Sequence, residues 1–498
     1  MPAFNPYLPS WEYVPDGEPR VFGDRVYVYG SHDLFGSRVY CEGDYVCWSA
    51  PVDDLSDWRY EGVIYRRDQE VIEEVSPWKE TAGFHPGDPA GTKLGYLYAP
   101  DCVQGPDGRY YLYYSMSGDT TTSVAVSDVP QGPFAFYGHV RHPDGRLYGH
   151  VAGDVNCFDP GVLVDEDGRV YLYSGFAPKN EKGYLRMSGT GLKVDGGYGV
   201  ELARDMLTLV SEQVMTIPGS YLYHGTPFDG HRFFEASSIR KIGGTYYLVW
   251  SSELSHELCY ATASAPLGPY TWGGILVSIA DLGLRGNTRP RSYTGNTHGG
   301  MVCVKGRWYI FYHRQTALYP FARQGCAEPI EIAADGSIAQ AEVTSCGLNG
   351  GPLPGRGVFE ARIACDLSSA EGIFDYGLCR PQEGHPYFTQ SAPDRTERPD
   401  QHIANMTDGS WCGFKYFDLR GVRELRATVR AACGGVLQVS RRQGGEAEAR
   451  IAVEASDSWA TFTAPFRPED GVTALFFTWR GEAPADFESF ELVTEEDL

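Results

Sequence analysis

The sequence of 498 residues lacks features that mark several large classes of protein. No run approaches the roughly 18 consecutive apolar residues of a membrane span, so we expect no membrane partner. Basic residues are scarce, with 42 Lys and Arg against 65 Asp and Glu, and a net charge of −23 repels nucleic acid. The chain opens MPAFNPYLPSWEY, without the basic and apolar segments of a signal peptide.

Paired cysteines are missing as well. The 12 cysteines are scattered along the chain, with no C-x-x-C pair and no dense framework. Zinc-site and EF-hand spacings are also absent from the sequence, and we expect no required cofactor. Free thiols are typical of a reducing compartment, so the sequence predicts a cytoplasmic location.

What the sequence does contain favours an all-β protein of two or three domains. Aromatic residues make up 13% of the chain, including 33 Tyr and 10 Trp, and aromatic side chains are enriched in strands. The 60 Gly and 32 Pro supply the many tight turns that short strands require.

A short pattern recurs five times in the first 345 residues: a turn, then a run of aromatic and β-branched residues. The copies are GDRVYVYG (23–30), DGRYYLYYS (107–115), DGRVYLYSG (167–175), GGTYYLVWS (243–251) and KGRWYIFYH (305–313). Three copies precede a second shared pattern, at 47–65, 124–140 and 260–277. A plain series of hairpins is the alternative, but the regular order predicts a five-bladed β-propeller over residues 1–345.

The third residues of the five copies align, and they are Arg25, Arg109, Arg169, Thr245 and Arg307. One ionisable residue lies 8 to 10 positions before each of them. The series is Asp16, Asp101, Asp159, Glu235 and His298. In a propeller this position lies on the innermost strand, beside the central channel, so the five groups are expected to converge. Neighbouring carboxylates raise one another's pKa, and one protonated acid beside one carboxylate is what glycoside hydrolysis requires.

Each member of the series also has a structural interpretation. Asp16 in YVPDGEP and Asp159 in NCFDPGV can serve as turn residues, and Asp101 in LYAPDCV can be architectural. A lone histidine such as His298 is commonly a satisfied core residue. Glu235 in RFFEASSI is hardest to explain this way, because a carboxylate among apolar residues is costly unless it is used.

Five ordered motifs carry a resemblance to a known family. They are NPYLPSWEYVPDGEP (5–19), LYAPDC (97–102), CFDPGVLVDEDGRVYLYSG (157–175), FFEASSIRKIGGTYYLVWSS (233–252) and THGGMV (297–302). Residues 1–345 resemble glycoside hydrolase family 43, five-bladed propellers that release arabinose or xylose with inversion. The resemblance implies that Asp16 is the general base, Glu235 the general acid and Asp159 the carboxylate that tunes and orients the acid.

The same resemblance implies further roles around the channel. His298 matches a channel histidine that is associated with a central water or a structural calcium ion, and Arg323 matches an arginine on the substrate. We also count His32, Asp33, Asp101 and His298 among the substrate-binding residues. The sequence departs from the family in having Pro-Asp-Gly around the base and Tyr98 where a Trp is common, which makes the sugar specificity hard to transfer.

The last third of the chain predicts a separate β-sandwich. A linker rich in Gly and Pro (341–356) precedes short strands, and helical periodicity is absent over residues 355–498. This region resembles family 6 carbohydrate-binding modules, which are jelly rolls. Trp411, Tyr416 and Trp479 can stack on a sugar, but we favour the interpretation that they fill the core or pack on the propeller.

These observations predict an inverting, exo-acting glycosidase that removes arabinofuranosyl or xylosyl residues from plant-type oligosaccharides, an α-L-arabinofuranosidase or β-xylosidase. The alternatives are a galactosidase or endo-arabinanase built on the same machinery, or an inactive carbohydrate-binding propeller. The insertion near 66–96 is expected to wall a closed pocket, which favours exo action. A homo-oligomer is compatible with the sequence.

Overall fold

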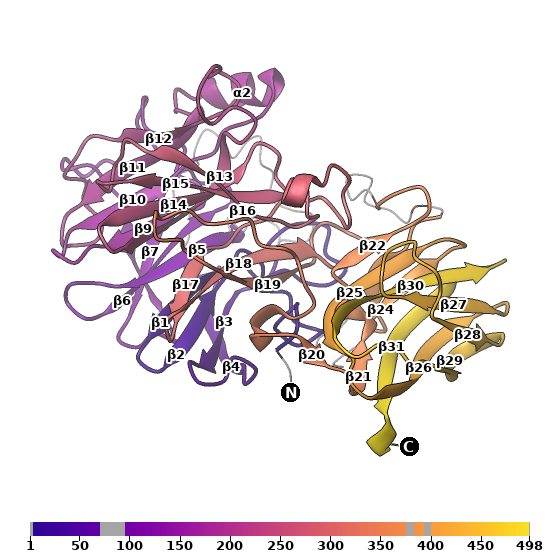
Figure 1. Cartoon of the computed structure of the whole chain (residues 1–498). Helices are drawn as coiled ribbons and strands as arrows, with labels where there is room; N and C mark the ends of the chain where they lie inside the picture. The colour runs from indigo at the N-terminus through magenta and orange to yellow at the C-terminus, as the bar shows by residue number, and fades with distance from the viewer. Residues whose placement is uncertain (1–2, 70–94, 375–381, 383, 393–399, 498) are drawn as a thin grey trace.

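The computed structural model describes residues 3–69, 95–374, 382, 384–392 and 400–497 (Figure 1). Most of the insertion expected to wall the pocket therefore lies outside the described residues. Strands dominate the described part, in which α2 (Glu181–Ser188) is the one α-helix. No described helix has both the length and the apolar character needed to cross a membrane.

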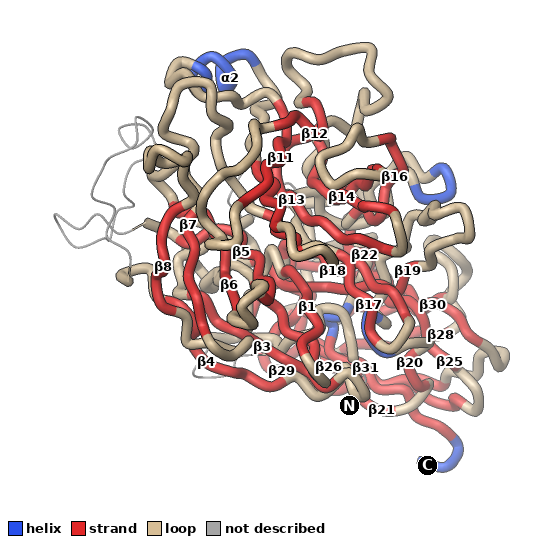
Figure 2. The backbone as a smooth tube through the Cα atoms, turned by 90° about the vertical axis from the view of Figure 1, so that its left-hand side faces the viewer, coloured by secondary structure: helices blue, strands red, loops and turns tan. Residues whose placement is uncertain are grey.

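The first part of the chain forms five antiparallel sheets, which are the blades of a propeller (Figures 1 and 2). The strands of blades one and two are β1 (Glu18–Phe22), β2 (Arg25–Tyr29), β3 (Tyr45–Pro51), β4 (Arg59–Tyr65), β5 (Leu97–Gln104), β6 (Tyr110–Met116), β7 (Ser123–Ser127) and β8 (Ala135–His139). Blade three contains β9 (Gly161–Val164), β10 (Val170–Ser174), β11 (Gly196–Leu202) and β12 (Val214–Pro218). Blades four and five contain β13 (Phe233–Ile242), β14 (Thr245–Ser252), β15 (Glu257–Ala263), β16 (Thr271–Ser278), β17 (Met301–Val304), β18 (Arg307–Gln315) and β19 (Arg323–Ile330).

The repeated sequence pattern forms the second strand of every blade. Its five copies become β2, β6, β10, β14 and β18, each paired with the innermost strand before it. The second shared pattern forms the outer hairpins β3–β4, β7–β8 and β15–β16. The predicted propeller is thus confirmed, and each blade begins at the channel and proceeds outward.

A buried set of charges joins the innermost strands at the centre. The strand pairs β1–β5, β5–β9, β9–β13 and β1–β17 are neighbours, and Arg240 Nε on β13 donates to the Met301 carbonyl on β17 at 2.7 Å. Arg20 pairs with Asp101 at 2.6 Å, and Arg240 pairs with Glu18 at 2.5 Å. These residues, which we call the hub, fill the channel with paired guanidinium and carboxylate groups.

The last part of the chain packs two six-stranded sheets face to face. One sheet contains β20 (Leu353–Pro354), β22 (Asp366–Ser368), β25 (Trp411–Asp418), β27 (Gly435–Ser440), β28 (Ala449–Val453) and β30 (Val472–Gly481). The other contains β21 (Gly357–Glu360), β23 (Tyr387–Gln390), β24 (Gln401–Met406), β26 (Val422–Ala431), β29 (Ser456–Pro465) and β31 (Ala485–Thr494). A 3-10 turn, Ala361–Ile363, directly follows β21.

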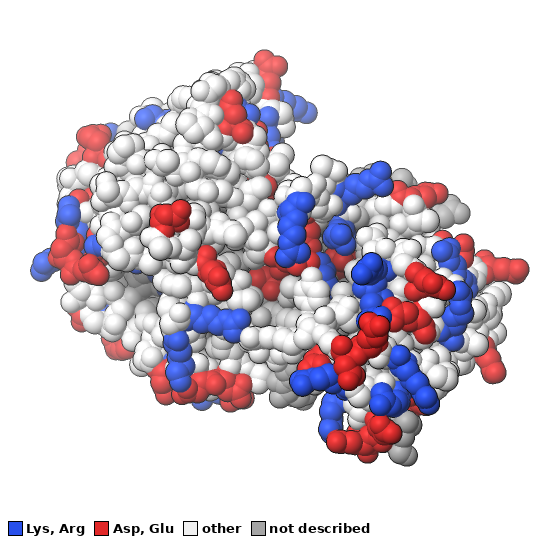
Figure 3. Space-filling model, in the orientation of Figure 1, with Lys and Arg blue, Asp and Glu red and all other residues white. Residues whose placement is uncertain are grey.

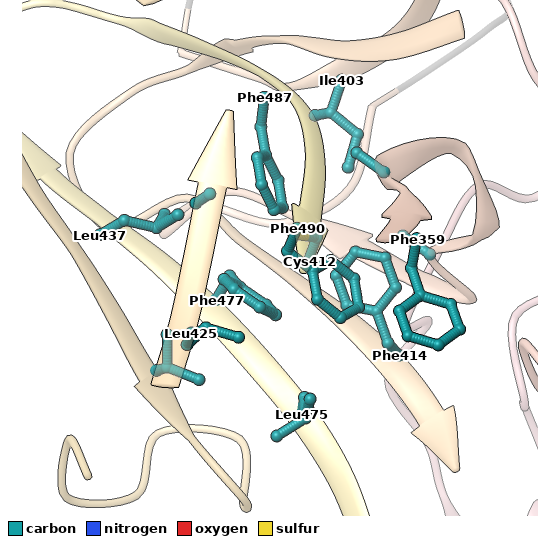
Figure 4. Packing of buried hydrophobic residues seen from close by; sticks show 14 of the residues in the cluster. Phe359, Ile403, Cys412, Phe414, Leu425, Leu437, Leu475, Phe477, Phe487 and Phe490 are labelled. Carbon is teal, nitrogen blue, oxygen red and sulfur yellow. The ribbon is translucent and has the colours of Figure 1, made fainter. Parts of the chain in front are cut away.

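Phenylalanine rings fill the space between the two sheets of the sandwich (Figure 4). Phe490 contacts Phe414 and Phe477, with ring centroids 4.9 Å apart in both pairs. Phe487 packs on Phe477 at 5.2 Å. Burial of such rings is the main stabilising contribution that this domain makes.

Polar contacts hold the sandwich against the propeller. Lys415 on β25 is buried and lies 2.9 Å from Asp281 and 3.3 Å from both Glu342 and Asp366. Farther along the interface, the Tyr13 hydroxyl donates to Gln390 on β23 at 2.7 Å. The sandwich therefore contacts the segment that leads into the first blade.

Candidate functional site

A pocket of about 610 Å³ opens at the end of the channel above the hub. All five blades contribute to its wall, and its volume is within the range of pockets for small ligands. The residues that line it are Asp16, Tyr40, Cys41, Tyr98, Ala99, Phe158, Asp159, Phe176, Phe234, Glu235, Leu254, Ser255, His256, Thr294, Gly295, Asn296, His298 and Arg323.

Strand register explains which members of the predicted series reach the pocket. The seventh residue of each copy pairs with a residue of the innermost strand, and in blade order these partners are Glu18, Asp101, Gly161, Ser238 and Gly300. Asp16, Asp159 and His298 lie two residues before this level, and Glu235 precedes it at an irregularity in β13. Asp101 thus lies at the level of the hub, and Ala99 takes its expected place in the pocket wall.

Asp16 is held as a carboxylate by the groups around it. Its backbone has φ 58°, and its amide N–H donates to His313 Nδ1 at 3.1 Å. The amide of His298 donates to the same nitrogen at 3.3 Å, so His313 fixes both residues. Burial alone would raise the pKa of Asp16, but Arg323, 3.0 Å from its Oδ1, and His313 hold that pKa below its usual range.

Glu235 and Asp159 have raised pKa values, in contrast to Asp16. Burial, together with the charge of Asp16, raises the pKa of Glu235 to about 7 against the opposing charges of Lys179 and Arg323. Burial and the charges of Glu235 and Asp16 raise the pKa of Asp159 well above its usual range. The pocket therefore places an ionised carboxylate beside carboxyl groups that retain protons near neutral pH.

His298 lies between these acids as a neutral imidazole. Burial lowers its pKa to about 4, and its Nδ1 is 3.6 Å from an oxygen of Asp159. This nitrogen is buried without a hydrogen-bond partner among the described residues. Calcium takes six to eight oxygen ligands. The neighbouring carboxylate of Asp16 is already bound to Arg323, so the side chains at His298 do not form a calcium shell of their own.

Three residues predicted to bind substrate lie outside the pocket wall, and those predictions are corrected. His32 is buried between Glu12, 3.0 Å from its Nε2, and the carbonyl of Asp44. Asp33 accepts from Arg323 at 2.8 Å and so supports that residue from behind. Asp101 is bound to Arg20 in the hub. Arg323 itself faces the pocket.

Sequence reasoning missed the aromatic wall and His313. Phe158 and Phe234 directly precede Asp159 and Glu235, and with Phe176 and Tyr98 they form a chain of edge contacts 5.2–5.4 Å apart. Their position beside the acids was an available signal. His313 was visible too, because it ends the fifth repeat where the other copies end in Gly or Ser.

Comparisons with known proteins found relatives of this chain. The sequence model of glycosyl hydrolases family 43 matches residues 20–338. A xylosidase/arabinosidase from Thermoclostridium stercorarium is 47% identical over 497 residues, covering 99% of both chains. Xylosidase/arabinosidase 43A from Humicola insolens is 30% identical over 60% of this chain and 88% of its own. The crystal structure of an arabinoxylan arabinofuranohydrolase from Bacillus subtilis covers 97% of this chain and 96% of its own at 21% identity, with a TM-score of 0.48.

Proposed function

The chain belongs to glycosyl hydrolases family 43 and is therefore a glycosidase, and on that premise we propose that it removes terminal xylosyl or arabinofuranosyl residues with inversion. Its substrates in this proposal are plant-type oligosaccharides. A relative with that pair of activities in its name, similar over nearly the whole chain, supports the choice of sugars.

Asp16 and Glu235 line one pocket and have pKa values shifted in opposite directions, and this is the observation that carries the mechanism. Glu235 gives its proton to the glycosidic oxygen as the bond from that oxygen to the anomeric carbon breaks. Asp16 accepts a proton from a water molecule whose oxygen bonds to the anomeric carbon from the opposite face. Each step is ordinary acid–base chemistry, and one displacement inverts the configuration.

Asp159 has a supporting role in this scheme. Burial and the charge of Glu235 raise the pKa of Asp159, and an oxygen of Asp159 lies 3.6 Å from His298 Nδ1. The amide of Asp159 donates to Ser115 at 3.0 Å, which fixes the residue in a left-handed backbone conformation with φ 48°. We infer that Asp159 tunes and orients Glu235, because neighbouring carboxyl groups oppose each other's ionisation.

The closed end of the channel supports exo action. The hub blocks passage through the propeller, so a sugar chain enters and leaves by the same opening. A pocket of about 610 Å³ with aromatic walls suits the end of an oligosaccharide. An endo-arabinanase needs an open groove, and an inactive binding propeller would not need acids with such different pKa values.

No step of this mechanism requires a metal. A structural calcium ion at His298 remains a prediction that the side chains around that imidazole do not favour. Treatment with a chelator is expected to leave turnover and the unfolding temperature unchanged. A loss of activity restored by calcium alone would reverse this conclusion.

The specificity is tested with a panel of nitrophenyl glycosides and proton NMR of the first sugar released. We expect turnover of β-xyloside and α-arabinofuranoside, weak turnover of galactosides, and the inverted anomer as the first product. The matched variant Glu235→Gln should lose turnover of oligosaccharides such as xylobiose far more than turnover of these activated aryl glycosides, whose leaving groups need little protonation. First release of the retained anomer would exclude the assigned mechanism.

A further inference from the structure

A second cluster of reactive side chains lies in the fourth blade, outside the pocket lining. His231 precedes β13, whereas Glu257 and Cys259 are alternate residues of β15 and so project from the same face of the sheet. One oxygen of Glu257, His231 Nδ1 and Cys259 Sγ all lie within 4.8 Å of one another.

The three side chains are already in contact, and one of them is accessible. His231 Nδ1 is 2.6 Å from Glu257 Oε1, and Cys259 Sγ is 3.5 Å from the same oxygen. Glu257 is 1% exposed and Cys259 is 0% exposed. The side chain of His231 is 30% exposed, so a small ion can reach the cluster from its side.

Neighbouring residues orient two of the three potential ligands, Glu257 and His231. The Ser252 hydroxyl donates to Glu257 at 2.6 Å, and the Trp250 indole N–H donates to the carbonyl of His231 at 3.0 Å. The His231 ring is stacked on Trp272, with centroids 4.9 Å apart and planes 18° apart. In metal sites, hydrogen bonds and packing contacts of this kind hold the residues that bind the metal in position.

We propose that His231, Glu257 and Cys259 form a binding site for a divalent transition metal of the zinc class. The combination of imidazole, carboxylate and thiolate suits zinc, and three protein ligands leave a fourth position for water on the exposed side. Calcium and magnesium are unsuitable, because they require oxygen ligands. The metal replaces the His231–Glu257 ion pair, and the protons of Cys259 Sγ and His231 Nδ1 are released to solvent.

A short turn, residues 252–256, connects this cluster to the wall of the pocket. Leu254, Ser255 and His256 line the pocket, and the amide of Leu254 donates to Ser252 at 3.1 Å. Two ligands about 2.1 Å from a tetrahedral zinc ion are about 3.4 Å apart, so the His231–Glu257 contact of 2.6 Å must widen. Because Ser252 is bonded to Glu257, that movement shifts the 252–256 turn and lowers turnover.

Zinc binding to the full chain is measured by equilibrium dialysis, and cobalt is substituted to detect the thiolate ligand by its absorption band. Wild type is expected to bind zinc at this site, and Cys259→Ser and His231→Gln are each expected to lose it. Ser252→Ala should weaken binding by about 10–100-fold, as loss of an outer contact does. Cys433→Ser, which changes an exposed thiol in the sandwich, is the matched control and should bind like wild type.

Equal zinc affinity in wild type, Cys259→Ser and His231→Gln would overturn the site, as would the absence of binding to wild type. Inhibition gives a second test, in which zinc lowers kcat rather than raising KM in wild type and in Cys433→Ser, but spares Cys259→Ser. If zinc inhibits all three equally, the link to the 252–256 turn is wrong. Because the dialysis measures no sugar turnover, it is independent of the proposed function.

Discussion

The centre of the propeller and the core of the sandwich are both largely buried, but charged side chains make up the first and apolar side chains the second. The propeller centre contains guanidinium and carboxylate groups, including Arg240, Asp101 and Asp16. The sandwich core is a set of aromatic and aliphatic side chains around Phe490. Buried charge costs free energy unless it is paired or used, so the contrast locates the chemistry in the propeller.

The surfaces of the two regions differ in the same view. Charged side chains of both signs are dense over the sandwich in Figure 3, whereas the propeller face is mostly uncharged. The sandwich thus has an apolar interior and a charged exterior, as a stabilising domain does. The propeller instead has buried guanidinium and carboxylate groups around its channel.

The largest expected effect comes from neutralising the base. Asp16→Asn should lower kcat/KM by about 10²–10⁴, the usual contribution of a positioned acid–base group. The variant should remain folded, so the loss of kcat/KM should not be explained by a fall in the free energy of unfolding. Asp24→Asn, in the exposed turn of the same blade, is the control and should retain wild-type kinetics. Equal activity of the two variants would remove Asp16 from the mechanism.

A substitution in the sandwich core should instead affect stability and leave activity unchanged. Phe477→Ala should lower the free energy of unfolding by about 3–5 kcal/mol, because it removes a buried ring and leaves a cavity. Denaturant titration measures that loss, and kcat of the folded fraction should stay near wild type. A large fall in kcat in the folded protein would show that the sandwich participates in the chemistry.

A smaller effect concerns Lys179, which lies at the mouth of the pocket. Its ammonium is 4.1 Å from the Phe234 ring centroid and donates to Ser255. Its charge lowers the pKa of Glu235, the acid that must be protonated for turnover. Lys179→Met should therefore raise that pKa and move the alkaline limb of the kcat/KM profile to higher pH.

Lys182→Met, on the exposed part of α2, is the control for that profile and should leave the alkaline limb in place. Wild-type activity itself is expected to fall as pH rises through about 7, the pKa of Glu235. An alkaline limb that does not respond to Lys179 would show that another group sets it.

The smallest effect is expected from the aromatic residues that could have bound sugar in the sandwich. Trp479 is 0% exposed, and Tyr416 donates to Glu342 of the propeller at 3.1 Å. Trp411 packs on Phe476 with centroids 6.1 Å apart. Trp411→Ala should leave retention on insoluble xylan unchanged, whereas reduced retention would assign this domain a binding role.

The fold could be predicted from the sequence because each blade contains one copy of the same strand pattern. The depth of each acid in the channel could not. Asp101 lies 8 residues before Arg109, and Asp16 lies 9 residues before Arg25. The sequence spacing therefore did not separate the acid at the level of the hub from the acid in the pocket. An irregularity between Tyr98 and Asp101 in β5 adds to the ambiguity.

Other parts of the site depend on contacts between distant segments. His313 lies near the end of β18, 297 residues from Asp16, and the hydrogen bond from the Asp16 amide to His313 Nδ1 depends on closure of the ring. The arrangement of Asp33 behind Arg323 likewise joins the first and last blades. Local sequence patterns contain no information about such contacts until the order of the blades is known.

The central claim is that Glu235 donates a proton to the leaving group, and leaving-group dependence tests it most directly. Glu235→Gln should hydrolyse a dinitrophenyl xyloside nearly as well as wild type, because that leaving group departs without a proton. The same variant should lose about 10²–10⁴ in kcat/KM on xylobiose, whose leaving group needs one. An equal loss on both substrates would contradict the assignment of Glu235 as the general acid.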